Sequence, residues 1–170
     1  MEQHYFIGAT LPKDLSQVIS DIQKELLIPH KILTPLAPHI TILEPHLLEA
    51  IPPDAFIPQV KKVADAVLPA QIVLTQTACF NKHILYIEAK NDKLTELRQQ
   101  LLSLLPEPSA SQQFHPHITL AQTKHNQVLT DALITSYRER IEPSLPTSFM
   151  VSQLSYFEWI HPRTYALYDI

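Results

Sequence analysis

The sequence predicts an α+β protein of two similar lobes, each with a small, largely antiparallel sheet and flanking helices, around a central cleft. The first observation is a repeat, since "PHITIL" at 38–43 and "PHITLA" at 116–121 lie 78 residues apart. The second is that apolar runs and helical stripes follow one another in the same order around both segments. A pseudo-two-fold duplication would place equivalent strands opposite each other, and a cleft between two lobes is a natural ligand site.

The first repeat, about residues 4–80, is predicted to run strand, helix, strand, helix, strand. Apolar runs mark the strands, and stripes with a period near 3.6 residues mark the helices. The predicted elements are a strand at 5–9, a helix from Asp14 toward Pro29, a strand at 38–43, a helix at 58–68 and a strand at 71–80. The residues expected to face inward from the two helices are Leu15, Val18, Ile19, Ile22, Leu26 and Leu27, and then Val60, Val63, Ala64 and Val67.

The second repeat, about residues 83–158, is predicted to follow the same order after a tight connection at Asn81 and Lys82. Its elements are a strand at 83–87, a helix from Asp92 toward Pro106, a strand at 116–121, a helix at 128–141 and a strand at 149–158. The apolar stripe of its first helix consists of Leu94, Leu97, Leu101, Leu104 and Leu105. One more strand, at about 164–169, follows the turn signal "HPR", so that residues 1–170 form a single bilobal domain.

The chain has one glycine among 170 residues, where average usage would give about a dozen. Phosphate-binding loops and dinucleotide-binding turns need two or three glycines, because their backbone must approach phosphate without an intervening Cβ. A G-x-S-x-G nucleophile elbow is excluded for the same reason. If this protein handles phosphate, it must do so largely with side chains.

The overall charge and the ends of the chain point to a small intracellular protein. A net charge of −4 and a pI of about 6.1 argue against a general polyanion-binding surface, so we expect short or end-bound nucleotides rather than long nucleic acid as partners. The single Cys79 excludes an intramolecular disulfide and fits a reducing compartment. The start of the chain has neither a basic segment nor a long apolar stretch, so we expect no signal peptide, and no apolar run has the length of a membrane span. We expect a cytoplasmic monomer with no membrane attachment and no obligate protein partner.

The repeated tetrapeptides place polar and apolar side chains on opposite faces. Side chains alternate along a strand, so His39 and Thr41 share one face, and His117 and Thr119 do the same in the second copy. If the apolar residues between them enter the core, two imidazoles and two hydroxyls converge on the cleft. The same pattern at matching places in an otherwise diverged repeat favours a site over two solvated strand faces.

The paired H-x-T-x motifs, each preceded by proline, and the segment "FHPHITLA" resemble the 2H phosphoesterase superfamily. The resemblance is strongest to its 2'-5' RNA ligase-like branch, whose members act as RNA 2',3'-cyclic phosphodiesterases, and it covers nearly the whole chain. It implies a bilobal α+β fold, metal-independent phosphoester chemistry without a cofactor, and short RNA ends or small cyclic-phosphate nucleotides as substrates. It carries over onto His39 and His117 as the acid–base pair and onto Thr41 and Thr119 as phosphate ligands. Relatives often have a basic residue where this chain has Gln122.

The chemistry itself explains why two histidines are needed. Opening a cyclic phosphodiester requires one proton to leave the attacking water and another to reach the departing ribose oxygen, on opposite sides of phosphorus. Histidine, with a pKa near 6.5, can do either near neutral pH. Threonine hydroxyls can donate hydrogen bonds to the non-bridging oxygens as charge shifts there. The sequence leaves open which histidine is the acid, and whether the site favours hydrolysis or 2'-5' ligation.

The sequence leaves two alternative functions open and offers three further candidate residues for substrate binding. His115 and His117 form an H-x-H pair with usable metal spacing, so a metal-dependent hydrolase is one alternative. A non-catalytic module that binds a nucleotide or phosphate in the cleft is the other, although two intact proton-transfer groups favour an enzyme. Further candidates for substrate binding at the cleft rim are His161 and Arg163, before the last strand, and Tyr156.

Overall fold

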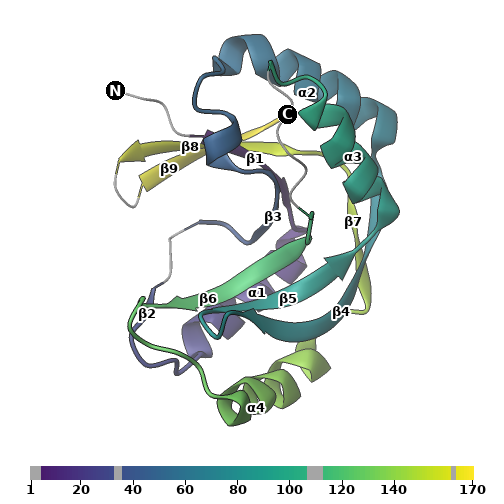
Figure 1. Ribbon diagram of the computed structural model, residues 1–170. Helices are drawn as coiled ribbons and strands as arrows, with labels where there is room; N and C mark the ends of the chain where they lie inside the picture. Colours follow the sequence, from purple (N-terminus) through teal and green to yellow (C-terminus); the bar gives the residue numbers. More distant parts are fainter. Residues whose placement is uncertain (1–4, 33–35, 107–112, 162–163) are drawn as a thin grey trace.

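One curled antiparallel sheet forms the frame of the molecule (Figure 1). The computed structural model describes residues 5–32, 36–106, 113–161 and 164–170. The strands in these residues are β1 (Tyr5–Thr10), β2 (Lys31–Ile32), β3 (His39–Leu43), β4 (Ala70–Phe80), β5 (Ile84–Lys90), β6 (His117–Thr123), β7 (Ser148–Val151), β8 (Ser155–His161) and β9 (Thr164–Asp169). Their order across the sheet is β7-β4-β5-β6-β3-β1-β8-β9, and β2 pairs with β6. The predicted α+β class is confirmed.

Helices pack around this sheet. They are α1 (Lys13–Glu25), α2 (Pro53–Val67), α3 (Asp92–Leu102) and α4 (Asp131–Ile141), with short 3₁₀ turns η1 (Pro45–Leu47) and η2 (Glu142–Ser144). Figure 1 shows α2 and α3 outside one end of the curl and α4 outside the other. No helix in the described part of the chain is long and apolar enough to cross a membrane.

The strands of the two predicted lobes meet at β3 and β6, whose register pairs Ile40 with Ile118. The expectation of two separate sheets is therefore corrected, because this junction makes the sheet continuous. On either side of it the order is mirrored: β5 and β4 follow β6, while β1 and β8 follow β3. Two copies of one unit would give this arrangement, and the duplication stays an inference from the sequence.

The elements of the first half agree with the predictions except at their ends. Helix α1 ends at Glu25, so Leu27 lies outside it and is 82% exposed, contrary to the predicted inward position. Helix α2 begins at Pro53, five residues before the predicted start, because proline is well suited to the first helical position. Its predicted inward residues Val60 and Ala64 are buried.

The connection between the halves is the predicted tight turn. Asn81 and Lys82 have φ angles of 48° and 61°, and the amide of His83 donates to the carbonyl of Phe80 at 2.8 Å. Two successive left-handed residues make a turn whose twist matches the flanking strands, and asparagine tolerates the first of them well. The chain thus builds a hairpin here without glycine.

In the second half, α4 begins later than predicted and the region 149–158 is not one strand. Thr130 caps α4 by accepting a hydrogen bond from the amide of Leu133, which sets the start at Asp131 rather than at residue 128. The predicted strand is divided into β7, which pairs with β4, and β8, which pairs with β1. Leu154, between them, is fully buried and anchors the chain where it passes from one half of the sheet to the other.

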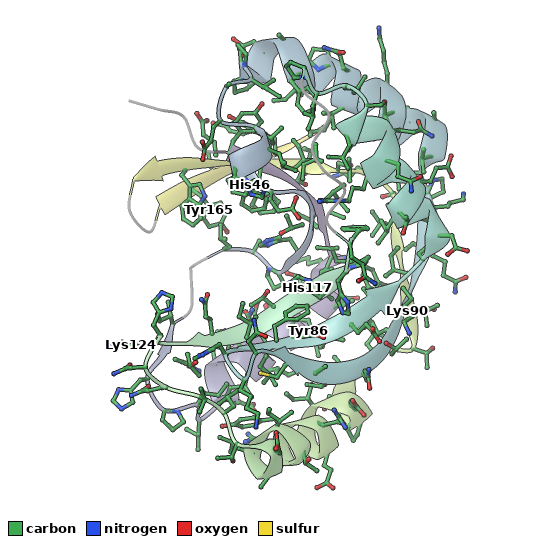
Figure 2. All side chains as sticks on the ribbon, viewed as in Figure 1. His46, Tyr86, Lys90, His117, Lys124 and Tyr165 are labelled. Atoms are coloured by element: carbon green, nitrogen blue, oxygen red, sulfur yellow. The ribbon has the colours of Figure 1, made fainter. Side chains whose placement is uncertain are left out.

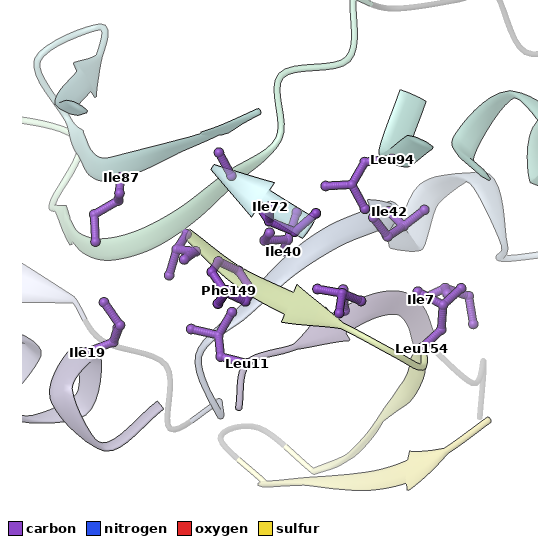
Figure 3. Close-up of a cluster of buried hydrophobic side chains, with 14 of the residues drawn as sticks. Ile7, Leu11, Ile19, Ile40, Ile42, Ile72, Ile87, Leu94, Phe149 and Leu154 are labelled. Atoms are coloured by element: carbon purple, nitrogen blue, oxygen red, sulfur yellow. The ribbon is translucent and has the colours of Figure 1, made fainter. Parts of the chain in front are cut away.

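A continuous hydrophobic core holds both halves together. Figure 3 shows part of it, including Ile40 and Ile42 of β3 with Ile19, Ile72 and Leu94 from α1, β4 and α3. Ile40 and Ile118 are both 0% exposed. The core side of β3 and β6 is therefore apolar, and the residues that alternate with these isoleucines face the inner side of the curl.

Candidate active site

The two motifs begin β3 and β6, the central strands of the sheet. His39 and His117 are the first residues of these strands, and both are partly buried. Thr41 is also partly buried, whereas Thr119 is exposed. Figure 2 shows His117 and Tyr86 on the inner side of the curled sheet. The predicted separation of polar and apolar faces is present in both strands.

The register of β3 and β6 sets which groups face one another. Because Ile40 pairs with Ile118 in an antiparallel ladder, His39 lies across from Thr119, and Thr41 lies across from His117. Directly opposite residues of such a pair point to the same face of the sheet. A pocket lined by both His39 and Thr119 agrees with this arrangement. Each imidazole therefore has a hydroxyl from the other motif as its cross-strand neighbour.

Both imidazoles are held by the same local hydrogen bond. Nδ1 of His39 lies 2.8 Å from the carbonyl oxygen of Ala37, and Nδ1 of His117 lies 2.7 Å from that of His115. A carbonyl oxygen can only accept, so Nδ1 must carry the proton in each ring. In the neutral form Nε2 is then the unprotonated nitrogen. Each ring can accept a proton at Nε2, or donate it from there once protonated.

Two stacked phenylalanines pack against His39. The rings of Phe6 and Phe157 are 4.5 Å apart, and their centroids lie 5.0 and 4.8 Å from that of His39. The single glycine of the chain, Gly8, is beside them in β1. A Cβ on Gly8 would lie 3.1 Å from a ring carbon of Phe157 and 3.2 Å from the carbonyl oxygen of Ile40. Gly8 thus allows Phe157 to pack closely behind the His39 ring.

The surroundings of His117 are aromatic and also charged. Phe80 and Tyr86 stack at 3.9 Å and contact His117 edge-on, with centroids at 5.0 and 5.3 Å. Glu88 pairs with His117 across β5 and β6. His115 lies nearby, with its ring centroid 6.3 Å from that of His117. The two histidines therefore differ in environment, since the rings that contact His39 are phenylalanines.

Burial lowers the pKa of both imidazoles below the ordinary value of 6.5. For His39, the hydrogen bond to Ala37 opposes this effect and the charge of His117 adds to it. For His117, the hydrogen bond to His115 and the charge of Glu44 raise the pKa, while the charge of His115 lowers it. His39 and His117 are thus close enough to interact electrostatically. Only His117 has a carboxylate that favours its charged form.

The hydroxyls of Thr41 and Thr119 make no hydrogen bond to any other described residue. The backbone carbonyl of Thr119 does accept one, from the side-chain amide of Gln23 at 3.0 Å, which ties β6 to α1. Two free hydroxyl donors and two Nε2 atoms make a set that can bind an oxyanion and move protons.

The sequence matches the family model of the 2'-5' RNA ligase superfamily over residues 11–161. The chain belongs to this superfamily. Its fold is similar to that of TT0787 of Thermus thermophilus, with 16% identity, a TM-score of 0.67, and coverage of 98% of this chain and 94% of that one. The E. coli LigT complex with 3'-AMP has 15% identity and a TM-score of 0.66, and the match covers 99% of this chain and 95% of that one. A crystal structure of a phosphoesterase has 15% identity and a TM-score of 0.63, and the match covers 99% of this chain and 95% of that one. No curated protein matches the sequence significantly.

Membership in the 2'-5' RNA ligase superfamily supports a phosphoesterase-type function. In this superfamily member, one buried guanidinium connects the segments next to both motifs. Arg98 of α3 is 5% exposed and donates to the carbonyl of Ile42 at 2.5 Å and to the carboxylate of Glu44 at 2.8 Å. Its guanidinium carbon also lies 4.9 Å from the ring centroid of Phe114. Ile42 and Glu44 end the first motif region, and Phe114 precedes the second.

Of the three rim candidates, Tyr156 lies away from the histidines. Tyr156 is buried and pairs with Ile7, whereas Phe157 next to it pairs with Phe6, so Tyr156 lies on the opposite face from the His39 ring. It packs there against Tyr5, with ring centroids 5.0 Å apart. His161 ends β8, and Arg163 lies outside the described residues.

The residues of the metal alternative are only partly grouped. Nε2 of His115 lies 3.7 Å from a carboxylate oxygen of Glu88, beside His117. Within the described ranges, no three histidine, cysteine, aspartate or glutamate side chains form a group that could hold a metal ion.

Several residues of the site were absent from the sequence predictions. They are the aromatic side chains Phe6, Phe80, Tyr86 and Phe157, the carboxylates Glu44 and Glu88, and Arg98. The aromatic residues occupy strands beside β3 and β6, where only the pairing of strands shows which rings reach the motifs. Arg98 had one available signal, since it is an arginine at a position between the inward leucines of α3.

Proposed function

We propose that this protein opens 2',3'-cyclic phosphates on RNA ends or nucleotides by general acid–base catalysis with His39 and His117. One observation carries the proposal: two imidazoles with the same Nδ1 anchor lie on one face, each across from a threonine of the other motif. A phosphoryl group bound on the inner face, where β3 pairs with β6, would meet a proton-transfer group on each side. Superfamily membership supports the same reaction class.

The reaction requires two proton transfers and one displacement at phosphorus. Nε2 of one histidine accepts a proton from water as the water oxygen bonds to phosphorus. The bond from phosphorus to one ribose oxygen breaks, and that oxygen takes the proton from Nε2 of the other, protonated histidine. The product is a ribose monophosphate, and the two histidines have exchanged protonation states. Hydroxyl donors of Thr41 and Thr119 stabilise the non-bridging oxygens.

The same constellation can run in reverse, so 2'-5' ligation or cleavage belongs to the proposal. Short RNA ends and small cyclic-phosphate nucleotides are the proposed partners, since the net charge is −4 and the site uses few cations. The solved LigT complex with 3'-AMP is consistent with a nucleotide ligand in this fold. We propose that the protein acts as a cytoplasmic monomer without a cofactor.

A product-resolved assay tests this function. We expect purified protein in EDTA to convert nucleoside 2',3'-cyclic phosphates and cyclic-ended oligonucleotides to monophosphate ends, with chromatography distinguishing the 2' and 3' isomers. Nucleotide binding without turnover would instead favour the binding module. Activity lost in EDTA and restored by zinc or manganese would contradict the proposed mechanism.

The pH dependence of kcat/KM should show the lowered pKa values of the two histidines. One imidazole must be neutral and the other protonated, so a bell-shaped profile is expected. Burial lowers both pKa values, so both rings lose their protons below the ordinary value of 6.5 as pH rises. The alkaline limb, where the imidazole with the higher pKa loses its proton, should therefore lie below pH 6.5.

Glu44→Gln assigns the limbs of this profile. The charge of Glu44 raises the pKa of His117, so its removal should lower that pKa and move one limb to lower pH. A shifted alkaline limb makes His117 the imidazole with the higher pKa, and a shifted acidic limb makes it the one with the lower pKa. A wild-type alkaline limb well above 6.5 would contradict the lowered pKa values of these histidines.

A further inference from the structure

A second hollow adjoins the proposed reaction centre at the start of β6. It has a volume of about 250 Å³ and lies where β5 ends and α3 begins. The side chains that matter here are those of Glu88, Lys90, Asp92, Thr95, Phe114 and His115. The proposed reaction uses none of them.

The hollow lies on the same face of the sheet as the reacting groups. Glu88 pairs directly with His117, so their side chains point to the same side. His115 is two residues before His117 on the chain and supplies the carbonyl that anchors its ring. The pocket lined by His39 and Thr119 includes Gln122, toward the other end of β6. A substrate with its phosphate at the centre of the site therefore has room on the His117 side.

The charges of the hollow favour a ligand with N–H donors over a phosphate. The hollow is lined by two carboxylates, those of Glu88 and Asp92, and by one ammonium group, that of Lys90. Glu88 is already engaged, because it accepts a hydrogen bond from Thr75 at 2.5 Å and lies 3.5 Å from the ammonium of Lys90. The pKa of Glu88 is lowered, mainly by the hydrogen bond from Thr75, and this favours the ionised carboxylate.

Asp92 is the acceptor that remains available. It is exposed at the first position of α3 and has no hydrogen-bond or ion-pair partner among the described residues. Thr95, three residues later, lies on the same side of the helix. Nε2 of His115 is buried without a hydrogen-bond partner in the described part of the chain. Phe114 and His115 add flat rings to these polar groups.

We propose that this hollow binds the nucleobase of the substrate and favours bases with an exocyclic amino group. Flat rings with carboxylate and hydroxyl groups at their edge are the usual means of recognising an unpaired base. Cytosine and uracil make the sharpest comparison, because they differ at C4, where cytosine has an amino donor and uracil a carbonyl. The Asp92 carboxylate accepts from the amino group and repels the carbonyl oxygen. The inference rests on the proposed function for the position of the phosphate.

The experiment compares kcat/KM for cytidine and uridine 2',3'-cyclic monophosphates in three proteins. The wild type should prefer cytidine by roughly fivefold or more, the lower range for one good contact to a base edge. Asp92→Ala should bring the ratio close to one. Asp131→Ala is the matched control, since Asp131 also follows the capping residue of a helix but lies on α4, and it should keep the wild-type ratio.

A binding measurement separates this inference from the proposed function. Calorimetry with the His39→Asn/His117→Asn variant gives dissociation constants for both cyclic nucleotides without turnover. Preference for cytidine that depends on Asp92 supports the base site, even if the wild type hydrolyses neither nucleotide and the proposed activity fails. Hydrolysis of both nucleotides at equal kcat/KM, or a preference that Asp92→Ala leaves unchanged, overturns the base site and leaves the activity standing.

Discussion

His39→Ala and His117→Ala are each expected to reduce hydrolysis of 2',3'-cyclic nucleotides by about 10²- to 10⁴-fold. In the proposed mechanism each ring supplies one of the two proton transfers. The structure holds each ring by one backbone hydrogen bond and a pair of aromatic rings. Because both transfers belong to the same displacement, the double variant should lose much less than the product of the single effects. Steady-state kcat/KM on one cyclic nucleotide measures all three.

Folding must be shown to survive these substitutions. Both rings are partly buried on the inner face but lie outside the apolar core, so the melting temperatures should fall by only a few degrees. His125→Ala is a suitable control, since His125 is exposed in the turn after β6 and should retain full activity. A folded single variant with nearly wild-type activity would rule out the two-histidine mechanism.

Ile40→Ala and Ile118→Ala are each expected to lower the free energy of unfolding by about 2–5 kcal/mol. Both side chains are fully buried, and they form the register pair that joins β3 to β6. Alanine removes most of the buried side chain and leaves a cavity that neighbouring strands cannot readily fill. Urea denaturation followed by circular dichroism measures the change.

Two further measurements test whether the effects come from the buried position of Ile40 and Ile118. Val73→Ala changes a strand residue that is 44% exposed, so its effect should be much smaller, about 0.5 kcal/mol or less. The double variant should show a coupling energy of about 0.5 kcal/mol or more, because the two side chains are direct cross-strand neighbours. Losses below about 1 kcal/mol for both core variants would mean that this junction is not a rigid part of the core.

Local patterns allowed most of the fold to be predicted. The alternation in β3 and β6, the stripes of α1 and α3, and the turn at Asn81 and Lys82 each depend on a few neighbouring residues. One error has a cause that no local pattern shows. Residues 149–158 have one apolar pattern, yet their pairing partner changes from β4 to β1, and a change of partner leaves no mark in a local pattern.

The candidate site was predictable only in its repeated part. His39, Thr41, His117 and Thr119 are visible because the same tetrapeptide occurs twice. The residues that make the surroundings of His117 differ from those of His39 are not part of the repeated tetrapeptide. Glu44 and Glu88 could not be assigned to the surroundings of His117 from the sequence, because they lie after β3 and on β5, far from it along the chain.

By itself, the sequence determined the α+β class, the two strands that present histidine and threonine on one face, and the exclusion of a glycine-rich phosphate-binding loop. These follow from residue periods and composition, which are local properties. Only the tertiary structure decided that each histidine faces the other motif's threonine, that Gly8 makes room for the ring behind His39, and that Asp92 and His115 line one hollow. Register, close packing and sheet curvature depend on contacts between distant segments, so they exist only once the whole chain has folded.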